Sequence, residues 1–325
     1  MSWFASIRSK ALVALVLLTV SAAVAAQGKT VVWVVPTPPG GVLDLTARMM
    51  AKKIKDRTGR NVVVENKTGG GGVIAAEYVL GSTRPDAIYV LSATQNIATV
   101  IDQQMPDLRF KPLRDFTAVH GFFYLPAVLV TPAGKPWGNL KQLVEMSKKS
   151  ETGLNVATTG IGGIGHAYMA SLIEATGLKA TMIHYKGSTP AVQDLLSGNI
   201  DLMFDYLATA ATHLKSGKLK ALTAMSTTRL AELPNVSTIA EEGYGSATII
   251  GWVGVLTRAG VPAEEVAALS KAIDDALQDP EVVAMNEKWG QIPMFELDHV
   301  RFGEFIRKEV DRWSTVYRKL GVKIE

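Results

Sequence analysis

The chain has 325 residues, 47% of them hydrophobic, which is enough material for one large or two medium domains with buried cores. Its lack of cysteine excludes disulfide frameworks, thiolate nucleophiles and cysteine-ligated metals. The formal net charge of +4 is too small, and the basic residues are too interspersed with acidic ones, for a nucleic-acid-binding protein. Mild basicity suits a small anionic ligand without establishing one.

The N-terminal segment has the three-part layout of a secretory signal peptide. Arg8 and Lys10, which supply two of the positive charges, precede the apolar run 11–20 and the small-residue segment 21–26. The apolar run is shorter than the roughly 20 residues that cross a bilayer core, so a cleaved leader is favoured over a membrane anchor. We predict cleavage near Ala26 and a mature protein in the periplasm, where dependence on a nucleotide cofactor is uncommon.

Strand-like and helix-like segments then alternate in the rhythm of a parallel sheet with crossover helices. In the first unit the predicted order is strand 30–35, helix 42–59, strand 61–66, helix 72–81 and strand 87–93. The rhythm restarts after residue 150, with strand 154–159, helix 165–177, strand 180–187, helix 190–198, strand 200–205 and helix 208–217. The sequence therefore predicts two α/β units.

Apolar runs flank the second unit on both sides, at 122–131 and 249–257. This symmetry is typical of a chain that crosses to a second domain and returns through a paired hinge. We predict a signal peptide over 1–26, a discontinuous first domain over 27–125 plus 251–325, and a second domain over 126–250.

The C-terminal part is predicted to form two helices, 262–279 and 300–321, with Pro262 in a first turn and Gly321 at a helix end. The last helix carries an apolar stripe, which predicts a buried face. The stripe consists of Phe302, Phe305, Ile306, Val310, Trp313, Val316, Tyr317 and Leu320.

Three glycines after the strand 154–159 have the G-x-G-x-x-G spacing of a dinucleotide-binding loop, namely Gly160, Gly162 and Gly165. That kind of site also needs an acidic residue at the end of the following strand, where this chain has HYKG over 184–187. The dinucleotide interpretation therefore fails, and no cofactor is predicted. The five histidines form no metal-ligand pair at helical spacing, so no metal site is predicted.

The glycine turn keeps another property, because a helix N-terminus offers free N–H groups that bind a carboxylate as readily as a phosphate. Similar turns precede predicted helices at Gly40–Gly41 and at Ser188–Thr189. A plain strand-to-helix connection is the competing interpretation of each turn taken alone. Three such turns in an exported two-domain chain favour an anion-binding cleft at the strand ends.

Several sequence blocks, taken in order, resemble those of the Bug-type solute receptors, the periplasmic binding proteins of the tripartite tricarboxylate transporter family. They include VVPTPPGGVLDLTARMMAKKI, VVVENKTGGGGVIAAE, GIGGIGHAYMA, HYKGSTPAVQDLLSGNIDLMFD and GKLKALTAMSTTRLAELPNVSTIAEEGY. The resemblance covers nearly the whole mature chain. It implies a type II periplasmic binding protein, with two doubly wound α/β domains joined by a two-strand hinge. Such a monomer would close on a small organic acid and pass it to membrane permease subunits.

In this family both glycine turns clamp a ligand carboxylate mainly through backbone N–H groups, and the resemblance implies the same role for the matching positions here. Backbone donors can hold a carboxylate without a buried arginine that needs its own partner. The candidate ligand-binding residues are Thr37, Gly40, Gly41, Val42 and Leu43 in the first turn, and Thr159, Gly160, Gly163 and Ile164 in the second.

Five further residues are candidates for the ligand site, each with a competing structural role. Thr94 and Gln95 follow a strand, where they can line the cleft or belong to a solvated loop. Asp205 can contact the ligand, directly or through a water, or cap the next helix. His166 can donate to the carboxylate or stabilise its turn, and Lys186 can neutralise the acid or point to solvent.

The chain departs from the family pattern beside both glycine turns. Receptors of this kind commonly carry hydroxyl residues where this sequence has Leu43, Gly163 and Ile164. Each unpaired ligand oxygen would cost about 1 to 3 kcal/mol, which disfavours a compact polyol acid or citrate. We therefore hypothesise that the ligand is an aromatic carboxylate or a medium-chain dicarboxylate. Asp44, in the first turn of its helix, is expected to stabilise that helix rather than to contact the ligand.

The leading interpretation of the whole sequence is an extracytoplasmic receptor without enzymatic activity. A periplasmic hydrolase is a weaker alternative, because the sequence has no G-x-S-x-G motif, cysteine nucleophile or clustered acid/base set. A ligand sensor for a membrane kinase would have the same fold and stays open.

Overall fold

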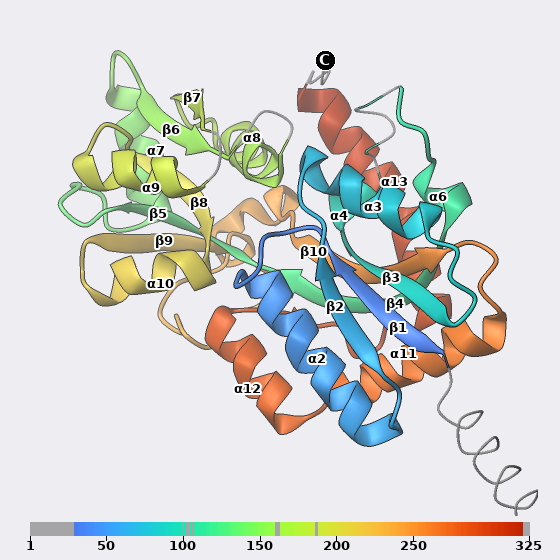
Figure 1. The fold of residues 1–325 in the computed structure, drawn as a ribbon. Helices are drawn as coiled ribbons and strands as arrows, with labels where there is room; N and C mark the ends of the chain where they lie inside the picture. The colour runs from blue at the N-terminus through green and yellow to red at the C-terminus, as the bar shows by residue number, and fades with distance from the viewer. Residues whose placement is uncertain are drawn as a thin grey trace, which may run out of the picture.

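The computed structural model describes residues 29–99, 101, 105, 107–159, 163–185 and 188–320. These residues form two α/β lobes that lie side by side, lobe 1 around the N-terminal strand and lobe 2 around the middle of the chain (Figure 1). The predicted signal peptide, Gly160, Gly162, Lys186 and the helix end at Gly321 lie outside the described residues. Within the described part, no helix is both long enough and apolar enough to span a membrane.

Lobe 1 is built on a six-stranded sheet in the order β11-β4-β10-β3-β1-β2. The strands are β1 (Thr30–Val35), β2 (Val62–Asn66), β3 (Ala87–Thr94), β4 (Phe116–Leu125), β10 (Gly251–Arg258) and β11 (Ile292–Pro293). β1 pairs in parallel with β2 and β3, whereas β10 is antiparallel to both β3 and β4. β11 adds an antiparallel edge to β4.

Lobe 2 is built on a five-stranded sheet in the order β7-β6-β8-β5-β9. The strands are β5 (Ala127–Pro132), β6 (Leu154–Thr158), β7 (Ala180–His184), β8 (Leu202–Tyr206) and β9 (Leu219–Met225). β6 pairs in parallel with β7 and β8, and β5 runs antiparallel between β8 and β9. The two sheets therefore share one plan, a parallel set with one antiparallel strand inserted beside it.

Helices and short turns surround the two sheets (Figure 1). Lobe 1 has α2 (Val42–Thr58), η1 (Gly70–Gly72), α3 (Val73–Gly81), α4 (Gln95–Thr99), α6 (Pro112–Asp115), α11 (Ala263–Leu277) and α12 (Pro280–Trp289). Lobe 2 has α7 (Leu140–Lys149), α8 (Ile164–Thr176), α9 (Ser188–Ser197), α10 (Leu207–Lys215), η2 (Ala240–Tyr244) and η3 (Gly245–Ala247). The last helix is α13 (His299–Leu320). α9 begins at Ser188, two residues before the predicted start at Pro190.

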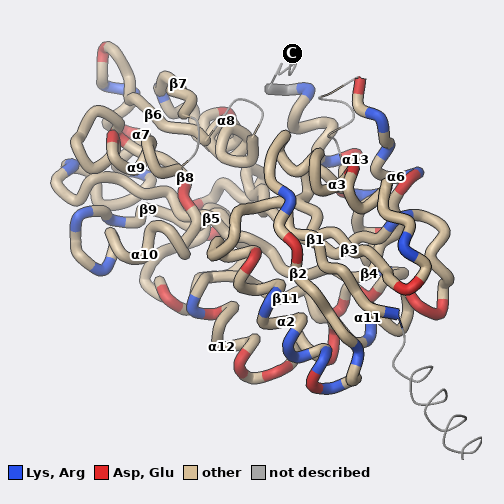
Figure 2. The backbone as a smooth tube through the Cα atoms, viewed as in Figure 1, with Lys and Arg blue, Asp and Glu red and all other residues tan. Residues whose placement is uncertain are grey.

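Alternate residues of β1 explain why this strand is apolar throughout. Trp33 belongs to a cluster that includes Met50 of α2, whereas Val34 belongs to a cluster on the other face that includes Val79 of α3. A strand covered on both faces has no solvent side on which polar residues would alternate. Charged residues of both signs occur along the helix α2 that covers one face (Figure 2).

Two segments connect the lobes close to the carboxyl ends of the parallel strands. β4 ends at Leu125 and β5 begins at Ala127, which pairs with Tyr206 at the end of β8. On the return, β10 begins just after lobe 2, and its Val253 pairs with Thr94 at the end of β3. Each crossing strand therefore lies beside strand ends that open α/β sheets use for ligands.

α13 is shared between the lobes. Phe302 and Ile306, near its start, are buried in a lobe 1 cluster, and Trp313 and Tyr317, near its end, are buried in a lobe 2 cluster. Four residues of the predicted apolar stripe are thus buried, against two cores instead of one, and Phe305, Val310 and Val316 are partly buried.

A buried carboxylate on α13 lies between these two groups of side chains. Glu309 Oε2 accepts hydrogen bonds from Trp252 Nε1 at 2.8 Å and from Trp313 Nε1 at 2.9 Å. Arg312 donates to Glu309 Oε1 at 3.3 Å and to the Thr248 carbonyl at 2.6 Å. Because Trp252 is in β10, this network ties the helix to a crossing strand.

The architecture confirms the predicted fold class, two doubly wound α/β domains joined by a two-strand hinge. The proposed boundaries, 27–125 plus 251–325 and 126–250, stay a prediction, and α13 contributes side chains to both cores.

Candidate functional site

The first glycine turn joins β1 to α2 and is held by a buried carboxylate. Asp44 Oδ2 accepts from the Gly40 amide at 2.9 Å and from Arg48 Nε at 3.0 Å, and Oδ1 accepts from Asn66 Nδ2 at 2.8 Å. Burial acts to raise the pKa of Asp44, but the bonds from Arg48, Gly40 and Asn66 outweigh it and the pKa is lowered. The carboxylate is therefore charged at neutral pH and stabilises the turn, as the sequence indicated.

Because of this network, Gly40 shapes the turn and does not offer its N–H to a ligand. The Gly40 N–H already donates to Asp44, and the φ of +83° at Gly40 gives the turn its shape. Gly41 is the N-cap of α2 and no side chain caps the helix. The first helical bond runs from the Leu45 amide to the Gly41 carbonyl at 2.9 Å, so the amides of Gly41, Val42 and Leu43 have no acceptor within the helix and are donors that this turn offers to an anion.

Two side chains of the first turn differ in whether they can reach a ligand. The Leu43 side chain is buried in the lobe 1 core, so only its backbone faces the turn. Thr37 Oγ1 is buried and has no hydrogen-bond partner among the described residues. A hydroxyl in that state is available to a ligand or to a water.

The second glycine turn joins β6 to α8. Gly163 is the N-cap of α8, again without a side-chain cap, and its carbonyl accepts from the amides of His166 and Ala167, both at 3.1 Å. The Ile164 and Gly165 amides therefore remain as candidate donors. A Cβ at Gly165 would lie 2.7 Å from Thr159 Oγ1, so only glycine lets the helix start this close to the strand end.

A narrow recess lies beside this second turn. Its volume is about 20 Å³, and it is lined by Ala127, Thr159, Ile164, Gly165, Tyr168, Ser188, Phe204, Asp205 and Tyr206. Three candidates from the sequence are thus brought together with Ser188, the first residue of α9. A larger cavity, about 640 Å³, opens instead between α8 and α13 and is lined by neither glycine turn.

Asp205 is the buried acid of the recess, with 3% of its surface exposed. Its Oδ1 accepts from Ser188 Oγ at 3.1 Å, and its Oδ2 has no hydrogen-bond partner among the described residues. Burial raises the pKa of Asp205, and contacts with Thr209, Ser188 and the Tyr206 amide oppose that rise. The alternative role at the helix start stays open, because Tyr206 is the N-cap of α10 without a side-chain cap while Asp205, one residue earlier, contacts Thr209 of the first turn.

The remaining candidates lie near these turns. Thr94 is half-buried at the end of β3, and Gln95 is buried at the start of α4. Asn96 Oδ1, one residue on, is buried without a partner in the described structure. His166 is buried with its ring 4.9 Å from the ring of His184, and burial, reinforced by His184, lowers its pKa. His166 is therefore neutral near neutral pH.

Tyr168 is a functional candidate that sequence reasoning missed. Its hydroxyl accepts from the Gly251 amide at 2.9 Å and donates to the Leu125 carbonyl at 3.3 Å. These are the first residue of β10 and the last of β4, so one side chain of α8 contacts both crossing strands. No sequence pattern marks this role, because the partners are 83 and 43 residues away.

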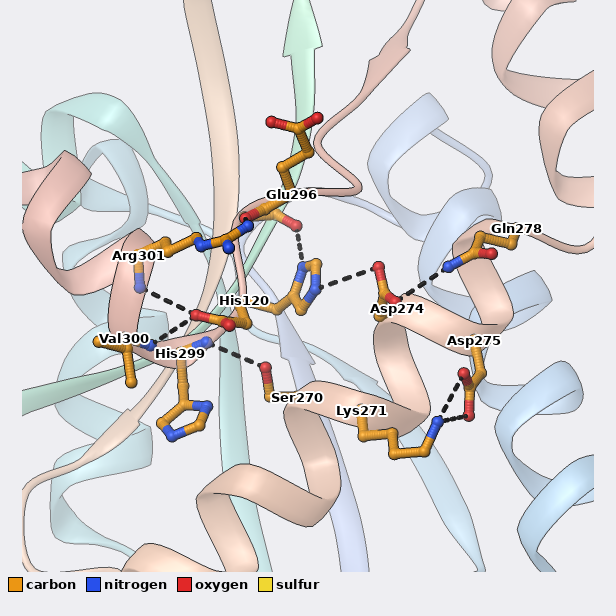
Figure 3. A network of polar contacts seen from close by, with 12 residues as sticks. His120, Ser270, Lys271, Asp274, Asp275, Gln278, Glu296, His299, Val300 and Arg301 are labelled. Atoms are coloured by element: carbon orange, nitrogen blue, oxygen red, sulfur yellow. Dashed lines mark hydrogen bonds and ion pairs between the residues drawn. The ribbon is translucent and has the colours of Figure 1, made fainter.

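A second polar cluster lies in lobe 1 around buried His120 of β4 (Figure 3). His120 Nε2 is 3.7 Å from Asp274 Oδ1 on α11, and Nδ1 contacts the Gly121 carbonyl. Burial lowers the pKa of His120, although Gly121, Asp274 and Asp298 act to raise it. The ring is therefore neutral and the cluster is structural. Over the described ranges, no group of three or more potential metal ligands is present.

Comparison with known proteins agrees with the family that the sequence blocks resemble. Residues 46–322 match the family model described as tripartite tricarboxylate transporter family receptor. The chain is 32% identical to protein BugT of Bordetella pertussis over 292 residues. The alignment covers 90% of this chain and 89% of BugT.

Solved structures are similar over nearly the full chain. MatC from Rhodopseudomonas palustris with bound malate is 27% identical with a TM-score of 0.72, covering 89% of this chain and 98% of that one. Rpa4515 from R. palustris with adipate is 25% identical with a TM-score of 0.77, covering 91% and 98%.

Proposed function

This chain belongs to the tripartite tricarboxylate transporter receptor family, and from that premise we propose that it captures a small organic carboxylate between its lobes and delivers it to a tripartite tricarboxylate-type permease. We further propose that residues 1–26 are a leader removed on export to the periplasm. N-terminal sequencing of the protein from a periplasmic extract checks cleavage near Ala26, and an intact leader would contradict it.

The observation that carries the proposal is the pair of uncapped helix N-termini, one on each lobe, beside the crossing strands. α2 and α8 both begin after a glycine N-cap without a side-chain hydrogen bond. Their first-turn amides and positive dipole ends suit a carboxylate. β3, the neighbour of β1, ends at Thr94, which pairs with Val253 of β10, while Tyr168, one turn into α8, bonds Gly251 of the same strand, so each turn lies on the side of its lobe that faces the crossing strand β10.

The proposed ligand is an acid with an aromatic ring or a medium-length chain. Gly163 and Ile164 supply no hydroxyl beside the second turn, and one relative of known structure holds adipate, a medium-chain dicarboxylate, whereas another holds malate, a compact hydroxy acid. Calorimetric titration with terephthalate, adipate and citrate tests this ligand class, and binding of citrate alone would reject it.

The substitution Gly41→Asp tests the anion site. A Cβ at Gly41 would have its nearest neighbour, the Pro38 carbonyl oxygen, at 3.5 Å, and the φ of −72° suits any residue, so the fold should survive. A fixed negative charge beside the α2 amides should weaken acid binding by about 100-fold or more. The measurement is calorimetric titration of the purified protein with whichever acid of the panel the wild type binds.

Gly134→Asp is the matched control. Gly134 is exposed, has open space around it and follows the far end of β5 from the recess, so affinity should not change. Equal losses in both variants, or unchanged affinity in Gly41→Asp, would contradict the proposed site.

A further inference from the structure

We infer that Tyr168 and Gly251 form a positioning pair, which holds the first turn of α8 against both crossing strands and so sets the arrangement of the two lobes. The Tyr168 hydroxyl makes its bonds to backbone groups, so the residue acts through α8 and the strands and not through contact with the acid. This inference rests on the proposed function, because it concerns how the same cleft is held together.

The Tyr168 side chain joins the two lobes. Its ring is buried in the lobe 2 core, 5.6 Å from the ring of Phe204 of β8. Its hydroxyl bonds the Gly251 amide and the Leu125 carbonyl, which belong to residues that face each other in the β4–β10 ladder of lobe 1. A rotation that moves lobe 2 away from these strand ends therefore has to break both bonds.

Burial also keeps this hydroxyl in the protonated form that the bridge needs. It raises the pKa of Tyr168 well above its ordinary value of 10.0, so the proton that is donated to the Leu125 carbonyl stays in place at neutral pH. The hydroxyl can thus donate to one crossing strand while it accepts from the other.

Gly251 is matched in size to the Tyr168 hydroxyl. A Cβ at Gly251 would lie 3.0 Å from Tyr168 Oη and 3.6 Å from Ile164 Cδ1. Ile164 is the first residue of α8, and its amide is a candidate donor to the acid. The return strand therefore lies directly against the turn that grips the carboxylate, where a shift of about 0.5 Å is enough to misplace the donors.

Loss of the hydroxyl should change which lobe arrangements are populated. In the arrangement described here, Tyr168→Phe leaves the Gly251 amide and the Leu125 carbonyl without their partner. Unpaired buried backbone groups are costly, and a rotated hinge lets water reach them. The equilibrium should therefore move toward other lobe angles, in which the donors of the two turns no longer face one acid.

The first experiment measures the lobe arrangement without any acid. The chain has no cysteine, so Lys55→Cys on α2 and Gln193→Cys on α9, both exposed, place one spin label on each lobe. Double electron–electron resonance then gives the distribution of distances between the labels. We expect a narrow distribution when Tyr168 is present and a broader one, or a second distance, with Tyr168→Phe.

Tyr78→Phe is the matched control for this measurement. It also removes a phenol hydrogen bond, from Tyr78 to Glu65 at 2.9 Å, but both residues belong to lobe 1. Its distance distribution should match that of the labelled protein without further substitution. Urea unfolding curves check that every variant is folded.

The second experiment tests the match between the two residues with a double-mutant cycle. Wild type, Tyr168→Phe, Gly251→Ala and the double variant are titrated calorimetrically with terephthalate, adipate and citrate. We expect each single substitution to weaken binding of any acid that the wild type binds by about 3- to 10-fold. The double variant should bind no more weakly than Tyr168→Phe, because the alanine Cβ occupies the space that the hydroxyl leaves.

The outcomes separate the two proposals. Equal distance distributions with Tyr168 and Tyr168→Phe, broadening in Tyr78→Phe as well, or losses that multiply in the double variant would overturn the inference. If the wild type binds no acid with a Kd below about 1 mM, the proposed function fails, and the distance measurement still decides whether Tyr168 sets the lobe arrangement.

Discussion

At the scale of single residues, glycine matters most where it lets two elements touch. Gly254 of β10 faces Phe302 of α13, and a Cβ there would lie 1.9 Å from Phe302 Cζ. Gly303, the next residue on the helix, has space instead, because its nearest neighbour, Ala118 Cβ, would be 3.8 Å from an added Cβ. Substitution by alanine should therefore lower the free energy of unfolding at Gly254 and raise it at Gly303.

Gly254→Ala should lower the free energy of unfolding by about 1–3 kcal/mol, since the Phe302 ring has to move within a filled core. Gly303→Ala should raise it by about 0.5–1 kcal/mol, since alanine favours the helix. Urea denaturation followed by far-ultraviolet circular dichroism measures both. Equal stability of Gly254→Ala and the wild type would show that the close contact is not a constraint.

At the scale of elements, one buried carboxylate of α13 joins the helix to both lobes. Glu309 accepts from the indoles of Trp252 and Trp313, which belong to apolar clusters of different lobes. Together with the Tyr168 hydroxyl between Leu125 and Gly251, it fixes helices from both lobes to the crossing strands. These are buried polar contacts, whose loss costs more than their formation contributes.

Glu309→Leu should destabilise the protein by about 2–5 kcal/mol, because two buried indole N–H groups lose their acceptor. Glu309→Gln keeps one acceptor oxygen and should cost less than half as much. Urea unfolding with tryptophan fluorescence measures the order of the three proteins. A Leu variant no less stable than the Gln variant would argue against the hydrogen-bonded role.

At the scale of the whole molecule, two buried neutral histidines make stability depend on pH. Burial lowers the pKa of both His120 and His166 below the ordinary value of 6.5. The unfolded chain therefore binds more protons than the folded one in mildly acidic solution, and stability falls as the pH drops below about 6.5.

His120→Gln should flatten this dependence by up to about 1.4 kcal/mol per pH unit between about pH 6.5 and 5. His120 is fully buried beside Asp274 of α11 (Figure 3), and Asp298 and His299 also act on its pKa, so no solvent contact reduces the penalty. Urea midpoints at a series of pH values provide the measurement. Parallel pH profiles for variant and wild type would show that the ring does not carry the effect.

How much the sequence could predict depends on the distance over which a signal acts. Periodicity and turn residues act locally, so the alternating strands and helices and the crossing runs were predicted and are confirmed. Asp44 was predicted to stabilise its helix from its place in the first turn, but its bonds with Arg48 and with Asn66 of β2 were not predicted. The Tyr168 bridge and the packing of Gly254 on Phe302 involve partners far apart in sequence, and no pattern marks them.

Because α13 adds side chains to both lobes, lobe 2 is not a self-contained unit that can be exchanged for the lobe 2 of a related receptor. Trp313 and Tyr317 would then meet a core that evolved with different neighbours. A functional hybrid has to inherit the final turns of the helix from the same parent as the grafted module, although those turns lie some sixty residues downstream of it.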